Sequence, residues 1–307
     1  EGFFLSYLSD VTVLIPVKDE EEAIGKVLDE VLSMGIPRER VIVVDGHSVD
    51  RTVDIAKNMG VVVVVQEGVG KSSAVKTGLK HSSTKYVVVM DGDYTYPAKY
   101  IPILVKEAVE KSCSFVFGRR RYGRENIPVL NRFGNWFLTN LFNVLLGGNL
   151  SDVCTGMYLL NIEELRDALF EMRGFSIEVE LAAHATGSGI SYCECGIEYR
   201  RRLGKRKLSI LDGFKIALDI VRLAWRYNPV TLMLVSASLI MIPGLVLGLY
   251  VAYNYFFTGI NYYVKGLIAI FLVTAGFQAL MLAILSIYLK RMELRIRHLL
   301  KELLKRS

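Results

Sequence analysis

The sequence predicts an α/β domain with a mostly parallel sheet, followed by two membrane-spanning helices. Over the first half of the chain, short runs rich in valine and isoleucine alternate with segments of helical spacing. Such unbroken apolar runs are typical of parallel strands that are covered on both faces. Near the other end, two long stretches carry no charged residue. A chain of 307 residues that is 52% hydrophobic suits one globular domain of about 200 residues plus a membrane segment.

The elements of the α/β domain follow one another in a regular order. An aromatic, Asn-rich amphipathic segment at 129–146, close to the basic residues at 119–121 and 124, leaves two interpretations open. Its aromatic face packs on the sheet, or it lies at a membrane face with its basic residues towards anionic headgroups. The expected strands are 11–17, 41–45, 61–66, 86–91, 115–118 and 190–200, and the expected helices are 20–34, 52–59, 72–80, 99–111, 129–146 and 211–227.

The two uncharged stretches, 230–253 and 266–289, each exceed the roughly 20 residues that cross a hydrocarbon core. Basic residues precede the first stretch and follow the second, so the positive-inside rule predicts an integral membrane protein whose main domain and both termini are cytoplasmic. These flanks explain the net charge of +6 without a nucleic-acid partner. The expected organisation is a domain at 1–208, an amphipathic juxtamembrane helix at 209–227, a transmembrane hairpin at 228–290 and a basic helix at 291–307.

Two carboxylates one residue apart, in Asp91-Gly92-Asp93, directly follow a predicted buried strand. Open α/β sheets bind ligands beyond the carboxyl ends of their strands. Two carboxylates suit Mg²⁺ or Mn²⁺, which take further oxygen ligands from water and from substrate phosphates. The sequence therefore predicts a metal at Asp91 and Asp93, next to a phosphate.

Other polar groups follow neighbouring strands and point to a shared nucleotide pocket. Asp45 ends the second strand, and we expect it to bind a base or a ribose hydroxyl; the alternative role is capping of the next helix, for which Asp50 is better placed. The loop Gly68-Val69-Gly70-Lys71-Ser72 is not a Walker A motif, because Val65 stands where the first glycine is required. Lys71, at a helix start, is still expected to contact a phosphate.

Five segments, in chain order, resemble the successive motifs of family-2 glycosyltransferases of the dolichyl-phosphate sugar synthase type. The resemblance extends over about residues 11–227 and is specific in combination. It implies a GT-A fold, a nucleotide-sugar donor, a divalent metal, and a polyprenyl or dolichyl phosphate acceptor in the membrane. The segments are 16–20, 43–52, 91–97, 152–156 and 202–208.

The resemblance also implies residue roles. Six residues would carry the reaction: Asp91, Asp93, Arg119, Arg132, Arg202 and Lys207. Arg202 and Lys207 belong to a basic loop over the phosphates, and Asp91 and Asp93 reach the metal. The residues expected to contact the donor, with Lys71 added because of its place at a helix start, are Pro16, Val17, Lys18, Glu20, Asp45, Lys71, Asp91, Gly92 and Asp93. The residues expected to contact the acceptor are Arg119, Arg132, Asp152 and Thr155.

Several positions depart from the common family pattern, including Lys18, Gly46 and Thr95. These departures resemble relatives that use UDP-sugars, so UDP-glucose or UDP-N-acetylglucosamine is favoured over GDP-mannose. A lipid phosphate is already an anion at pH 7, so an inverting single displacement needs positioning and charge neutralisation rather than a strong base. Two alternatives are a processive polysaccharide synthase and a non-catalytic membrane protein that binds nucleotide sugars.

Overall fold

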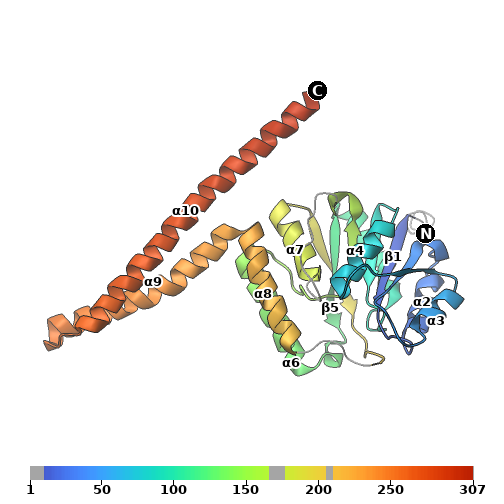
Figure 1. Cartoon of the computed structure of the whole chain (residues 1–307), viewed down its shortest axis with the longest axis horizontal. Coiled ribbons are helices and arrows are strands. Elements are labelled where there is room, and N and C mark those ends of the chain that lie inside the picture. The colour runs from blue at the N-terminus through green and yellow to red at the C-terminus, as the bar shows by residue number, and fades with distance from the viewer. Residues whose placement is uncertain (1–9, 166–176, 205–209, 307) are drawn as a thin grey trace. The chain divides into compact units, whose positions relative to one another are not determined.

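The structure is a computed structural model that describes residues 10–165, 177–204 and 210–306. It divides into two compact units (Figure 1). The first contains the β-sheet and extends over 1–143 and 148–220. The second consists of 144–147 and 221–307 and contains the two long C-terminal helices.

Within the described residues, the first unit contains a seven-stranded sheet with the order β3-β2-β1-β4-β6-β5-β7. Only β6 runs against its neighbours, β4 and β5; the other pairs are parallel. The predicted mostly parallel α/β sheet is therefore confirmed. The strands are β1 (Val11–Val17), β2 (Val41–Asp45), β3 (Val62–Val65), β4 (Tyr86–Met90), β5 (Phe115–Tyr122), β6 (Met157–Asn161) and β7 (Tyr192–Glu198).

The helices that begin in this unit alternate with the strands, and the last residues of α6 and α8 belong to the second unit. The predicted helix at 20–34 begins later, at Ile24, because residues 21–23 form a turn. The predicted helix at 99–111 starts with a short 3-10 turn, Ala98–Tyr100, before α5. The helices are α2 (Ile24–Ser33), α3 (Thr52–Asn58), α4 (Lys71–His81), α5 (Ile101–Glu110), α6 (Val129–Leu146), α7 (Ile177–Ser188) and α8 (Ile210–Tyr227).

Two elements of the structure, β6 and α7, were not predicted. All five residues of β6 are buried, as are those of the predicted β2, but β6 contains no valine or isoleucine, the residues that mark the predicted strands. In α7, every residue from Ile177 to Ala185 is buried. A helix that is covered all round has no polar stripe, and its 3.6-residue periodicity disappears from the sequence.

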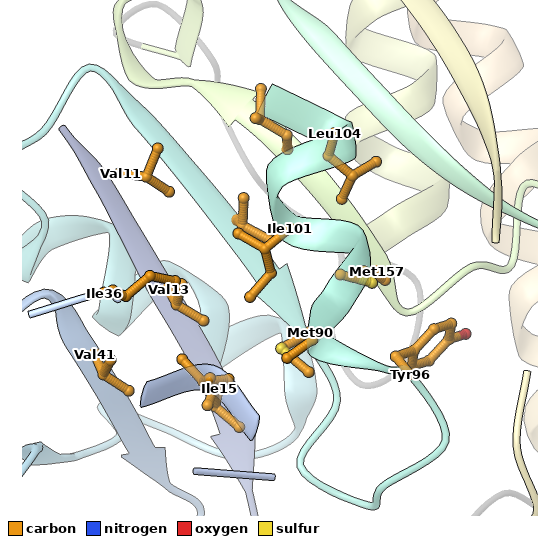
Figure 2. Close-up of a cluster of buried hydrophobic side chains, with 14 of the residues drawn as sticks. Val11, Val13, Ile15, Ile36, Val41, Met90, Tyr96, Ile101, Leu104 and Met157 are labelled. Atoms are coloured by element: carbon orange, nitrogen blue, oxygen red, sulfur yellow. The ribbon is translucent and has the colours of Figure 1, made fainter. Parts of the chain in front are cut away.

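The main core lies between the strands β1, β2 and β4 and the helices α2 and α5 (Figure 2). Val13 and Ile15 of β1 and Ile101 of α5 are fully buried, and burial of each such side chain stabilises the fold by about 1.5–3 kcal/mol. Tyr96 joins the same cluster at its edge. Its hydroxyl accepts a hydrogen bond of 2.7 Å from the backbone N–H of Gly156. The core thereby fixes the loops that follow β4 and precede β6.

The second unit contains α9 (Pro229–Tyr253), a π-helical turn (Asn254–Thr258) and α10 (Tyr263–Arg306). Gly244 faces Leu272, and Gly276, further along the chain, faces Met241, so the two helices form an antiparallel hairpin (Figure 1). The connection is shorter than the gap at 254–265 between the two predicted membrane stretches, because helical structure continues to Thr258 and resumes at Tyr263. The predicted basic helix at 291–307 is continuous with α10 as far as Arg306.

By length and composition, two helical segments of the described chain can cross a membrane: Pro229–Thr258, with 30 residues, and Tyr263–Leu289, with 27. Only 11% and 17% of their most apolar windows are buried inside the protein. Core helices of soluble proteins that pass the same test are mostly buried. The exposed apolar surface of this hairpin therefore indicates membrane association.

Candidate active site

Acidic residues lie where neighbouring parallel strands end. Asp45 is the last residue of β2 and is in register with Val17, the last residue of β1. Asp91 directly follows β4, which pairs with β1 on its other side. The carboxyl ends of these three strands form one edge of the sheet, which is the ligand-binding edge of open α/β folds. Pro16 and Val17 belong to β1 itself, and the exposed Lys18 follows them.

Arg202 joins two of the predicted site residues. Its guanidinium lies 2.5 Å from Asp93 Oδ2 and also contacts the Glu20 carboxylate. The chain around it is fixed on the Asp93 loop by the backbone, since Leu203 N–H donates to Asp93 O at 3.2 Å. The described part of the basic loop therefore lies directly on the Asp91–Asp93 turn. Lys207 lies outside the described residues.

Lys71 connects Asp91 to a residue that the sequence analysis did not select, Glu178. The Lys71 Nζ lies 2.5 Å from Asp91 Oδ1 and 2.5 Å from Glu178 Oε1. Burial lowers the pKa of Lys71, but the two carboxylates raise it more, so the ammonium stays charged. Burial, opposed by Lys71 and reinforced by Asp93 and Glu178, raises the pKa of Asp91 to about 6.

Glycines leave room for the Asp91 carboxylate and the turn after it. A side chain at Gly156 would overlap Asp91 Oδ2. At Gly92, a Cβ atom would come within 2.5 Å of Val17 Cγ1. Close packing on both sides restricts where the carboxylates of this turn can lie, which suits a site that must hold charged groups in fixed positions.

The loops after β1 and β2 are bound to each other. Asp45 accepts a hydrogen bond from Ser48 N–H at 3.1 Å, and Glu20 N–H donates to Thr52 Oγ1 at 2.8 Å. Asp50 accepts from Thr52 N–H at the start of α3, at 3.0 Å. The N-cap residue of α3 is Arg51, which makes no side-chain capping bond, so Asp50 is not the N-cap that was expected. It accepts from the first N–H of the helix from one residue further out.

The two arginines predicted for the acceptor have different surroundings. Arg119, on β5, donates to Ser151 Oγ at 3.2 Å, and Ser151 is held in turn by Glu194 of β7. Arg132, on α6, is half-buried. Its Nε is shielded from solvent and has no hydrogen-bond partner among the described residues. A shielded guanidinium nitrogen without an acceptor is costly unless an anion binds there.

Asp152 and Thr155 have protein partners. Arg120 binds both carboxylate oxygens of Asp152, each at 2.6 Å, and the Thr155 hydroxyl donates to the Gly118 carbonyl. These contacts fix the loop between α6 and β6 against β5. The acceptor roles of Asp152 and Thr155 stay predictions. Arg120 was not selected from the sequence. Had the predicted strand been extended to Tyr122, the alternation of side chains would have placed Arg119 and Arg120 on opposite faces of the sheet.

The carboxylate oxygens of the predicted metal site suit a hard divalent cation. Among the described residues, no group of three or more His, Cys, Asp or Glu side chains could enclose a metal. Asp91 and Asp93 offer carboxylate oxygens only, and the Asp91 side chain is 26% exposed. This set suits Mg²⁺ or Mn²⁺, which commonly bind through one or two carboxylates and complete their shell with water and phosphate oxygens.

Comparisons with solved structures identify the fold. Glucosyl-3-phosphoglycerate synthase from Mycobacterium tuberculosis, in complex with uridine diphosphate, superposes with a TM-score of 0.58 at 20% sequence identity. The match covers 74% of this chain and 83% of that one. The same enzyme with Mn²⁺, uridine diphosphate and phosphoglyceric acid gives a TM-score of 0.56 at 22% identity, covering 72% and 80%. The expected GT-A fold is confirmed.

Sequence comparisons identify the family. Glycosyltransferase AglJ from Haloferax volcanii is 30% identical over 90% of this chain and 92% of its own length. A dolichyl-phosphate hexose transferase from the same organism is 35% identical over 69% of this chain and 93% of its own length. The family model described as glycosyl transferase family 2 matches residues 12–167, half of the chain. The chain therefore belongs to glycosyl transferase family 2 and is a glycosyltransferase.

Proposed function

We propose that this enzyme transfers a hexose from a nucleotide sugar to a polyprenyl or dolichyl phosphate, in a reaction that depends on Mg²⁺ or Mn²⁺. One observation carries the proposal: the chain combines a carboxylate site at the ligand edge of its sheet with a hairpin of two exposed apolar helices. This combination suits a soluble donor and a membrane-bound acceptor. The relative that is described as a dolichyl-phosphate hexose transferase supports the same acceptor class.

We assign the donor to the edge formed by β1, β2 and β4. Asp45 and Glu20 lie beside the base and ribose, and Lys71 and Arg202 lie beside the diphosphate. A UDP-sugar, UDP-glucose or UDP-N-acetylglucosamine, is favoured over GDP-mannose. The solved structures of similar fold that contain uridine diphosphate support this choice.

Asp91 and Asp93 would hold the metal. A divalent cation there supplies positive charge to the diphosphate, which becomes the leaving group. Arg202 is already directed at Asp93, so the protein's own cation lies next to the same leaving group. Removal of one such electrostatic partner typically costs about 10²–10³ in rate.

We assign the acceptor phosphate to Arg119 and Arg132. A phosphate monoester anion attacks the anomeric carbon directly, so the site must orient it and neutralise charge rather than deprotonate it. The unpartnered, shielded Nε of Arg132 supports an anion at this place. A single displacement inverts the anomeric centre and gives a β-linked product from an α-linked donor.

The membrane assignment follows from three elements. The hairpin of α9 and α10 spans the bilayer, and α8, which ends one residue before α9, is the amphipathic juxtamembrane helix. We place residues 1–208 and both termini in the cytoplasm. The exposed apolar residues of α6, with Phe133 and Trp136 at 62% and 59% exposure, favour the second interpretation of that helix, at the membrane face.

The acceptor assignment is tested by steady-state kinetics of Arg132→Ala in detergent with a polyprenyl phosphate. We expect the KM for the lipid to rise about tenfold or more, because a charge-assisted contact to phosphate is lost, and the donor KM to change much less. Arg124→Ala, an exposed arginine outside the site, serves as the matched control. Equal effects of Arg132→Ala on both KM values would contradict the assignment.

The two alternative functions predict other results. A processive polysaccharide synthase would extend a polymer rather than release a lipid-linked monosaccharide. A non-catalytic binding protein would bind the donor without transfer, which membership of a glycosyltransferase family disfavours. Product analysis with the donor in large excess over the enzyme separates all three.

A further inference from the structure

Glu178 is a buried carboxylate close to the predicted metal site, and neither the donor nor the acceptor assignment uses it. It lies in the first turn of α7, and its side chain is only 6% exposed. Its Oε1 atom lies 2.5 Å from Lys71 Nζ, which is at the same distance from Asp91 Oδ1. One ammonium group, itself 15% exposed, thus bridges a predicted metal ligand and a carboxylate of another helix.

The pairing has a consequence for the charge of the site. A lysine that faced Asp91 alone would neutralise it, and the aspartate would attract a cation weakly. A buried carboxylate close to another is unfavourable without a compensating positive charge. In the two ion pairs of Lys71, two carboxylates, Asp91 and Glu178, face one cation, which leaves one negative charge between them.

We propose that Glu178 is a positioning residue that takes up the charge of Lys71, so that Asp91 keeps its negative charge for the divalent cation. The proposal rests on the metal-dependent function proposed above. Glu178 need not touch the metal or the sugar. It acts through Lys71, whose place at the start of α4 also puts its ammonium next to the expected diphosphate.

The test is a double-mutant cycle read by metal affinity rather than by activity. The dissociation constant for Mn²⁺ is measured by electron paramagnetic resonance of free Mn²⁺, with saturating UDP, and with GDP in parallel. Glu178→Gln removes one negative charge and should weaken Mn²⁺ binding on the order of tenfold. Lys71→Gln removes one positive charge and should not weaken it, and the double variant should return close to the wild-type value.

Glu67→Gln is the matched control. It makes the same chemical change beside the same helix, since Glu67 pairs with Lys80 of α4, but both side chains are more than 60% exposed. Its Mn²⁺ affinity should equal that of the wild type. Glu178→Asp keeps the charge and should recover most of the affinity lost in Glu178→Gln, and the thermal midpoint of each variant reports whether the fold is intact.

Two results would overturn the proposal. The first is an unchanged Mn²⁺ affinity in folded Glu178→Gln. The second is a loss that persists in full when Lys71→Gln is added, because Glu178 would then act independently of Lys71. Wild-type protein that binds no Mn²⁺ in the presence of saturating UDP or GDP would instead contradict the metal dependence of the proposed function, and the inference about Glu178 would fall with it.

Discussion

Gly156 shows how closely the protein encloses the Asp91 carboxylate. A Cβ atom at this position would overlap Asp91 Oδ2 and would come within 3.0 Å of the Tyr96 ring. The backbone N–H of Gly156 is at the same time the donor to the Tyr96 hydroxyl. Tyr96 is buried in the main core, so the position of the carboxylate depends on packing that reaches far into the sheet.

We therefore expect Gly156→Ala to lower kcat/KM by about 10² or more, because a displaced carboxylate costs as much as a removed electrostatic partner. Sugar transfer under donor-limiting conditions measures this loss. Gly134→Ala, at a position with open space around it, should leave transfer unchanged. Near-wild-type activity of Gly156→Ala would show that Asp91 does not require its present position.

Asp50 contributes to stability rather than to chemistry. Burial raises its pKa, but hydrogen bonds from the Thr52 hydroxyl, Thr52 N–H and Glu21 N–H outweigh that effect, and the net pKa is lowered. A carboxyl group whose pKa falls on folding stabilises the native state above its unfolded pKa, near 3.9. This stabilisation is lost as the pH falls through the lower, folded pKa.

Asp50→Ala should therefore cost about 1 kcal/mol of stability at pH 7, because the N–H groups of Glu21 and Thr52 lose their acceptor. Thermal unfolding monitored by circular dichroism measures the difference. The difference between wild type and variant should shrink as the pH is lowered below about 4. A difference that stays constant down to pH 3 would show that the charge of Asp50 has no part in it.

The residues of the site differ in whether the sequence alone identifies them. Asp45, Asp91 and Asp93 follow apolar runs that mark strands, so their common edge could be predicted. Glu178 could not be predicted as a partner of Lys71, because the two are brought together by a helix without apolar periodicity. Arg120 was not predicted for another reason. The predicted strand ended at Gly118, whereas β5 continues to Tyr122 and includes the arginines.

Among the elements, α6 has two apolar faces. One contains buried residues such as Phe142 and Leu138, and the other exposes Phe133, Trp136 and Phe137. A helix that only packed on the body of the domain would need just the first face. The chain contains two tryptophans, Trp136 on α6 and Trp225 on α8, with 59% and 61% exposure. Their fluorescence therefore reports the surroundings of the exposed faces of both helices.

In nanodiscs, we expect phospholipids with brominated acyl chains to quench the fluorescence of both tryptophans, because interfacial helices bury their apolar face at the headgroup boundary. Trp225→Phe isolates the signal of Trp136, and Trp136→Phe isolates that of Trp225. Strong quenching of Trp136 by aqueous iodide, with no effect of the brominated lipid, would place α6 in water and restore the first interpretation of this helix.

Small residues bring α9 and α10 together. A Cβ atom at Gly276 would lie 2.5 Å from Met241 Cβ, and one at Gly244 would lie 2.8 Å from Leu272 Cβ. Close approach of backbones at glycine is a common basis of helix association in membranes, where dispersion rather than the hydrophobic effect acts between helices.

Gly276→Leu should therefore separate the hairpin locally and lower the thermal midpoint of the detergent-solubilised protein by several degrees. Gly266→Leu is the control, since its nearest neighbour, Val251 Cγ1, is 3.7 Å from the added Cβ. The two variants make the same change in the same helix. Equal midpoints for both would contradict the close contact at Gly276.

At the scale of the whole molecule, the sequence predicts the architecture better than the contacts within the site. Periodicity and apolar runs predict β1, β2 and α6 with the bounds that the structure has, and the family resemblance predicts the GT-A fold. The antiparallel β6 was missed because it contains no valine or isoleucine, and the enclosed α7 was missed because burial on all sides removes the helical periodicity. Contacts such as Lys71 with Glu178 depend on that missing helix.

The central claim is that this glycosyltransferase makes a lipid-linked monosaccharide. It is tested most directly by incubating the detergent-solubilised protein with a polyprenyl phosphate and radiolabelled UDP-glucose, UDP-N-acetylglucosamine or GDP-mannose, with Mg²⁺, Mn²⁺ or EDTA. We predict that label from a UDP-sugar enters the organic phase as a lipid-linked monosaccharide, and that EDTA abolishes the transfer. Label that stays in the aqueous phase with all three donors would contradict the claim.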